Sequence, residues 1–214
     1  GAGIFNTENL TVRNSKVTGN EFIRASRGSG IYNAGNIKVE NSAIYGNRPG
    51  ESFSNDYRGR NYGTSGAGIG LFNNGVAEIT NSEFRDHRAR LGGGAGIANS
   101  DSGRLIVRNS QFENNRIYSG SGGSVSNAGT AVIVGSTVSN SEAAFGGGIS
   151  NSGSLQLVRS TVSGNTAGLS FSYFGTPYAN SGGGGGIINT NGTLTIENST
   201  VSGNTALLRG GGVF

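Results

Sequence analysis

The side chains of this sequence that could carry acid–base chemistry near neutral pH are one histidine and 12 acidic residues. His87 directly follows Asp86, and a carboxylate beside an imidazole can orient it as a general base. The sequence places no nucleophile next to this pair, and a lone histidine among polar turn residues is more often a turn substitution. We therefore interpret His87 as part of a turn.

Glycan cleavage would need two carboxylates that converge on a groove, or carboxylates that hold Ca²⁺ beside a base. The acidic residues are spread thinly, and Glu40, Glu78, Glu83, Glu113 and Glu197 rarely fall in adjacent repeats. The absence of cysteine excludes a thiolate metal site. We predict no catalytic residue, no metal and no cofactor, and keep a polysaccharide lyase or hydrolase that acts on an acidic glycan as the alternative.

Arginine and aromatic side chains are better candidates, for binding rather than catalysis. The corner segments between repeats contain nine arginines against four acidic residues, and the rest of the chain has one more acidic than basic residue. The corners therefore account for the whole net charge of +4. Guanidinium groups pair with anions, and aromatic rings bury large areas at interfaces. The alternatives are that the rings cover the flank of the fold and that the arginines form a solvated edge. The candidates for binding a partner protein, a glycan or a neighbouring subunit are Phe53, Tyr57, Arg58, Arg60, Tyr62, Arg88, Arg90, Arg116, Tyr118, Phe171, Tyr173, Phe174 and Tyr178.

A repeat positions these side chains. The 41 glycines show no Gly-X-Y period and the chain has two prolines, which excludes collagen. Instead a Gly-Ile or similar dipeptide recurs, mostly at intervals in the twenties, and an Asn follows it. The apolar residues of this dipeptide are Ile4, Ile31, Ile69, Ile97, Val125, Ile149, Ile187 and Val213, and the Asn residues are Asn6, Asn33, Asn73, Asn99, Asn127, Asn151 and Asn189. Each repeat therefore begins with a short strand that ends in Asn.

A second strand with alternating apolar residues follows, then a serine that is present in all seven repeats, then an apolar residue of a third strand. The serines are Ser15, Ser42, Ser82, Ser110, Ser136, Ser160 and Ser199. Three short strands separated by Asn, Ser and Gly turns predict an all-β fold: a right-handed single-stranded parallel β-helix, a solenoid of about seven coils. We expect the Asn and Ser columns to form structural ladders from coil to coil.

Two motifs support a resemblance to a known class. Gly-Gly-Gly-Ile occurs at 146–149 and 184–187, and Phe-Glu-Asn-Asn occurs at 112–115. These segments resemble the GG[AILV]I and FxxN repeats of chlamydial polymorphic membrane proteins and related bacterial right-handed β-helix surface proteins, including autotransporter passengers. The resemblance implies a secreted, adhesin-like β-helix.

The sequence predicts one domain over residues 1–214, with insertions at 48–66 and 166–184 on one corner, and it begins and ends within a repeat as part of a longer chain would. We expect an extracellular or cell-surface structural or adhesive module of a bacterium, and no enzyme. The expected partners are other protein subunits or surface glycans, with a homo-oligomer or filament as one form. We expect no membrane span, and nucleic acid is the least favoured partner.

Overall fold

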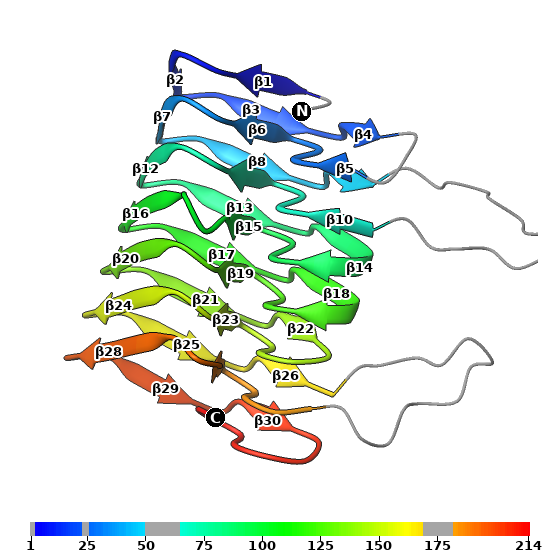
Figure 1. Ribbon diagram of the computed structural model, residues 1–214, viewed down its shortest axis with the longest axis vertical. Helices are drawn as coiled ribbons and strands as arrows, with labels where there is room; N and C mark the ends of the chain where they lie inside the picture. The colour runs from blue at the N-terminus through cyan, green and yellow to red at the C-terminus, as the bar shows by residue number, and fades with distance from the viewer. Residues whose placement is uncertain (1–2, 23–25, 50–64, 169–181) are drawn as a thin grey trace, which may run out of the picture.

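The computed structural model describes residues 3–22, 26–49, 65–168 and 182–214. These residues form thirty β-strands and no helix. Four parallel seven-stranded sheets run along one solenoid (Figure 1), and a two-stranded sheet adds to its first coils. The prediction of an all-β parallel solenoid of about seven coils is confirmed.

The first three sheets contain the predicted strands. The first sheet consists of β1 (Ile4–Asn6), β6 (Ile31–Asn33), β11 (Leu71–Asn73), β15 (Ile97–Asn99), β19 (Val125–Asn127), β23 (Ile149–Asn151) and β27 (Ile187–Asn189). The second consists of β2 (Asn9–Arg13), β7 (Asn36–Glu40), β12 (Val76–Thr80), β16 (Arg104–Arg108), β20 (Thr130–Val134), β24 (Ser154–Val158) and β28 (Thr193–Glu197). The third consists of β3 (Lys16–Thr18), β8 (Ala43–Tyr45), β13 (Glu83–Arg85), β17 (Gln111–Glu113), β21 (Thr137–Ser139), β25 (Thr161–Ser163) and β29 (Thr200–Ser202).

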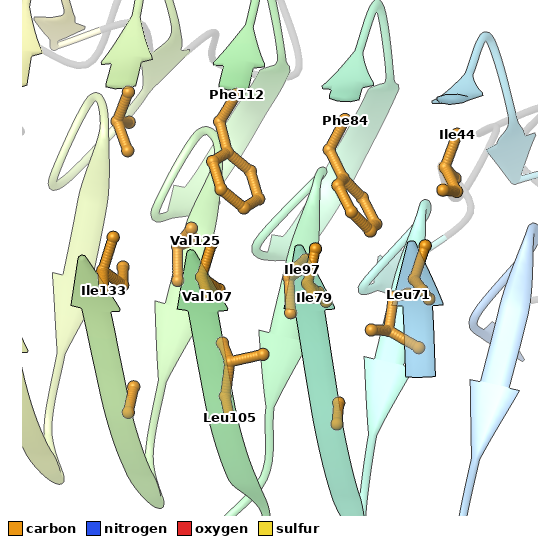
Figure 2. Packing of buried hydrophobic residues seen from close by; sticks show 14 of the residues in the cluster. Ile44, Leu71, Ile79, Phe84, Ile97, Leu105, Val107, Phe112, Val125 and Ile133 are labelled. Atoms are coloured by element: carbon orange, nitrogen blue, oxygen red, sulfur yellow. The ribbon is translucent and has the colours of Figure 1, made fainter. Parts of the chain in front are cut away.

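Columns of apolar side chains, one residue per coil, fill the interior of the solenoid. On β16 the alternate residues Leu105 and Val107 are fully buried, as the period of two predicts. Phe84 and Phe112 stack in adjacent coils, with ring centroids 5.4 Å apart and ring planes inclined by 17° (Figure 2). Because equivalent apolar residues of successive coils stack on one another, the core continues through the coils without a break.

The Asn residues that end the first strands form a ladder through the solenoid. Asn73 Nδ2 donates to Asn99 Oδ1 at 2.8 Å, and Asn99 Nδ2 donates in turn to Asn127 Oδ1 at 2.8 Å. Asn99 Nδ2 also donates to the carbonyl oxygens of Gly103 and Thr130, at 3.0 and 3.2 Å. The same side-chain bond links all seven Asn residues of the column. Because these amides are largely buried, their mutual bonds fix the register of neighbouring coils.

The serine column forms a second ladder in the turn between the second and third sheets. The backbone N–H of Ser110 donates to Ser136 Oγ at 3.1 Å, and the Ser136 hydroxyl donates to the carbonyl oxygen of Val134 at 2.9 Å. The N–H to Oγ bond recurs from each serine to the next. Each serine thereby satisfies a backbone donor one coil away, which a turn would otherwise leave unpaired.

The predicted alignment is wrong in one coil, where Leu71 and not Ile69 occupies the apolar column of the first sheet. Leu71 pairs in register with Ile31 on one side and with Ile97 on the other. The column residue lies two positions before the Asn in every coil, and Leu71 keeps this spacing to Asn73 whereas Ile69 does not. The spacing to Asn therefore carries the register more reliably than the Gly-Ile dipeptide.

The structure adds a fourth strand to each coil, at the corner that the sequence indicated as variable. The fourth sheet consists of β5 (Ser26–Arg27), β10 (Ser65–Ala67), β14 (Arg88–Gly93), β18 (Arg116–Ser121), β22 (Glu142–Ala143), β26 (Thr166–Ala167) and β30 (Thr205–Ala206). The separate two-stranded sheet consists of β4 (Glu21–Phe22) and β9 (Arg48–Pro49). A separate small core of Ile69, Ala89, Ala95 and Ile117 joins the fourth sheet to the segments that precede β11 and β15. The glycines of the fourth sheet allow the backbones of neighbouring coils to approach closely. A Cβ on Gly92 would collide with the carbonyl oxygen of Gly66 in the preceding coil.

In the turn between the second and third sheets, one residue of each coil has a left-handed backbone conformation, and in most coils this residue is Asn. Arg159 stands at this position with φ of 47°, next to Gly135 with φ of 58° in the preceding coil. Asn tolerates this conformation better than a long side chain does. We expect Arg159→Asn to raise the free energy of unfolding by about 1 kcal/mol in urea denaturation. Arg159→Ala, which removes the guanidinium but keeps the strain, is the control; equal stability of the two variants would contradict this account.

Candidate functional site

The described part of the candidate corner contains a group of basic and aromatic side chains on the fourth sheet and on β9 of the two-stranded sheet beside it. We call Arg48, Arg88, Arg90, Arg116 and Tyr118 the basic edge. Arg88 and Arg116 are register partners on β14 and β18, and Arg48 occupies the same position one coil earlier, directly after the Asn column of the turn. Parallel in-register pairing places equivalent residues about 4.8 Å apart. Three like charges therefore follow one another along the solenoid.

Carboxylates neutralise both ends of this row of arginines. Arg48 Nη2 lies 2.9 Å from Glu21 Oε2, and Arg116 Nε lies 2.8 Å from Glu142 Oε2. The second pair makes no directed hydrogen bond, so its attraction is that of charge. The guanidinium of Arg116 also lies over the ring of Tyr118, 4.5 Å from its centroid.

The centre of the row keeps its charge. Arg88 and Arg90 are both exposed on β14, with buried Ala89 between them. Within the described residues neither arginine lies within ion-pair distance of a carboxylate. Two guanidinium groups on one strand face, beside two that are neutralised, make a local positive site that can pair with carboxylate, sulfate or phosphate groups.

The remaining candidate residues belong to segments that the structure does not describe. They are Phe53, Tyr57, Arg58, Arg60, Tyr62, Phe171, Tyr173, Phe174 and Tyr178. The structure does describe the strands that flank these segments: β10 ends one insertion and β26 begins the other, and both belong to the fourth sheet. Each insertion therefore adjoins the fourth sheet at one of its ends.

His87 is fully buried and faces backbone rather than a reactive group. Its Nε2 lies 3.1 Å from the carbonyl oxygen of Ile44, and its Nδ1 lies 3.3 Å from that of Asn47. In four other coils an Asn makes an equivalent bond to the preceding coil, as where Asn115 Nδ2 donates to the carbonyl oxygen of Phe84. Burial lowers the pKa of His87 to about 4. The imidazole thus replaces a structural amide, in keeping with the interpretation of His87 as a turn residue.

Most described carboxylates near the surface are engaged by bases. Arg85 Nη1 lies 2.7 Å from Asp86 Oδ2 and its Nε lies 3.4 Å from Glu83 Oε2, and this neighbourhood raises the pKa of Arg85. The Arg85 guanidinium also lies 4.3 Å from the centroid of Tyr45. Among the described residues no group of three or more His, Asp or Glu side chains could hold a metal ion.

Sequence reasoning missed the ion pairs that join neighbouring coils. Glu21 with Arg48 and Arg116 with Glu142 occupy one column, and counting residues after the Asn or Ser of the turn would have aligned them. It also missed a stack of aromatic rings on the outward side of the first sheet. Phe5, Tyr32 and Phe72 stack with centroids 5.0 and 5.4 Å apart, and the same alignment places them in one column.

Comparison with known families identifies the fold. The family model described as "Right handed beta helix region" matches residues 58–214. The chain belongs to the right-handed β-helix family. The match covers the β-helix coils from the fourth sheet's β10 to the last strand, and it includes β14 and β18 of the basic edge. Searches of curated proteins and of solved structures each returned no match to this β-helix. In the described residues of the β-helix, no helix is long and apolar enough to cross a membrane.

Proposed function

We propose that this β-helix is a non-catalytic extracellular or cell-surface module that binds an anionic glycan along its basic edge. The observation that carries the proposal is the uncompensated charge of Arg88 and Arg90, set between arginines whose carboxylate partners lie in the next coils outward. Exposed guanidinium groups at a fixed spacing form charge-assisted hydrogen bonds with carboxylate or sulfate groups.

A linear ligand fits a linear site. The row runs along the solenoid axis with one position per coil, about 4.8 Å apart, so a polymer with repeated negative charges can contact several coils at once. Tyr118, beside Arg116, offers a ring at the same edge. The aromatic residues of the two insertions, each of which adjoins the fourth sheet at one end, are the second element of this proposal.

The resemblance of the repeats to bacterial surface proteins supports the extracellular assignment. The engagement of carboxylates by bases supports a binding role over catalysis, because glycan cleavage needs acids that are available to the substrate. Glu21, Glu142 and Asp86 each lie within 3 Å of an arginine nitrogen.

The test is binding of polygalacturonate, dextran sulfate and neutral dextran to the wild type and to Arg88→Glu/Arg90→Glu, measured by biolayer interferometry in low salt. We expect the anionic polymers to bind, the neutral polymer not to bind, and the double variant to bind at least about tenfold more weakly. Binding should weaken as salt screens the charges.

The matched control is Lys16→Glu/Arg104→Glu, which makes the same change in net charge on other sheets. We expect this variant to retain binding within about threefold of the wild type. Equal losses in both double variants would show attraction to net charge rather than a site, and no binding by the wild type would reject the proposal. A rise in reducing ends after incubation with polygalacturonate would instead favour the lyase or hydrolase alternative.

A further inference from the structure

The outward face of the second sheet changes character along the solenoid. In its first coils the charges pair with one another: Arg13 Nε lies 2.7 Å from Glu40 Oε2, and Lys38 Nζ lies 3.8 Å from Glu78 Oε2. From β16 to β28 the face instead carries aliphatic side chains between isolated charges. This second sheet lies on the side of the solenoid opposite the fourth sheet (Figure 1), so the face is separate from the basic edge.

In-register pairing defines one column of this face as Arg108, Val134, Val158 and Glu197. The next column consists of Ile106, Val132, Gln156 and Thr195. We call these eight residues the valine face. Its four aliphatic side chains point away from the solenoid interior and are only half-buried, although neighbours in their own columns cover their flanks. The valine face therefore exposes a continuous apolar strip on a sheet whose other described outward positions are polar, except for Val76 on β12.

The two charges at the ends of the strip cannot reach each other. Three coil steps separate Arg108 from Glu197, which is about 14 Å. Within the described residues Arg108 has no carboxylate partner, and the Glu197 carboxylate makes only a long contact with the Gln156 amide, at 3.5 Å. Arg108 and Glu197 are both exposed.

The column of Arg108, Val134, Val158 and Glu197 is complementary to a second copy of itself that runs in the opposite direction. We propose that the valine face binds a second copy of this chain through a two-fold axis that lies parallel to the strands, between β20 and β24. This operation keeps the position along the strand and reverses the order of the coils. Arg108 of each copy then faces Glu197 of the other, and Val134 faces Val158. In the second column Val132 faces Gln156, so no charge is buried against an apolar side chain.

The other in-plane axis is disfavoured by charge. A two-fold axis along the solenoid would keep the coil and reverse the strand, which places Arg104 of one copy against Arg108 of the other. Like charges that face each other across an interface oppose association. The charges at the two ends of the strip thus select one of the two arrangements.

The contact area between the two valine faces determines how tightly the copies associate. It spans about 16 Å along the strands and about 19 Å across four coils, so the total buried area is on the order of 600 Å². Interfaces below the standard size belong to weak and transient complexes. We therefore expect a reversible dimer that forms only at high protein concentration.

A charge-reversal cycle tests the arrangement by sedimentation equilibrium at up to about 1 mM protein. The wild type is expected to dimerise, Arg108→Glu and Glu197→Arg are each expected to lower the association constant at least about tenfold, and the double variant is expected to recover it. Recovery by two changes on exposed positions cannot come from misfolding. A wild type that stays monomeric, or a double variant that stays as weak as the singles, would overturn the proposal.

Cross-linking gives a second readout, because the chain has no cysteine of its own. Under mild oxidation, Arg108→Cys mixed with Glu197→Cys is expected to give a disulfide-linked heterodimer, at several times the yield of either variant alone. If Arg108→Cys links as well to Arg104→Cys as to Glu197→Cys, the proposed axis is wrong.

Discussion

Asn99→Ala is expected to lower the free energy of unfolding by about 3 kcal/mol, because it interrupts the buried ladder at its middle. The change removes Asn99 Oδ1, which accepts from Asn73 Nδ2, and Asn99 Nδ2, which donates to Asn127 Oδ1. It also leaves the carbonyl oxygens of Gly103 and Thr130 with one partner fewer. Buried polar groups that lose a partner cost more than the mean value of a hydrogen bond. Urea denaturation followed by circular dichroism measures the loss.

The matched control is Asn36→Ala. Asn36 is exposed on the second sheet, where its Nδ2 donates to Asn9 Oδ1 at 2.9 Å, and we expect a loss below about 0.5 kcal/mol. Hydrogen exchange adds a local readout, since a solenoid need not unfold as one unit. Exchange should accelerate most in β11, β15 and β19. Equal effects of Asn99→Ala and Asn36→Ala would show that the ladder does not stabilise the coils.

Acid is expected to destabilise the protein through His87. The unfolded imidazole has a pKa near 6.5, and burial lowers the folded value to about 4, so the unfolded state binds a proton that the folded state rejects. Stability is complete above about pH 6.5 and falls as the pH drops towards 4, by about 3 kcal/mol in total. The neighbouring charges of Asp86 and Arg85 act in opposite directions and are smaller causes than burial.

His87→Asn separates this effect from the titration of carboxylates. Asn occupies the same turn position in adjacent coils, where Asn47 Nδ2 donates to the carbonyl oxygen of Val17 at 2.9 Å. We expect similar stability of the two proteins at pH 7 and a flatter dependence of the variant between pH 6.5 and 4, measured as urea midpoints. Parallel pH profiles of wild type and variant would contradict the assignment to His87.

Much of the fold could be predicted because each coil repeats the same physical constraints. Alternation of apolar residues identified the second strands, and fixed spacings to Asn and Ser placed the turns between the first three sheets. The one error of register, Ile69 in place of Leu71, arose where both residues follow glycine and both are fully buried. Burial alone does not distinguish the two positions, since Ile69 belongs to a second, smaller core.

The fourth strand could not be predicted from periodicity. Its members have two to six residues, and β14 ends in the glycines that close backbone contact requires, which leaves no alternation to detect. The candidate site could be predicted only in part, for a related reason. The sequence indicated the excess of arginine at this corner, but whether each arginine is neutralised depends on which residue the next coil places beside it. The register of the coils, not the composition, places Glu142 beside Arg116 and places no described carboxylate beside Arg88.

The Asn ladder also gives the solenoid an electrical direction. Every Asn-to-Asn bond in that column runs from the amide nitrogen of one coil to the amide oxygen of the next, and the backbone N–H donors of the serine column point the same way. Strand dipoles in a sheet largely cancel, whereas these aligned amides add and polarise one another. The Asn ladder therefore carries a dipole along the solenoid axis, with its positive pole towards β27.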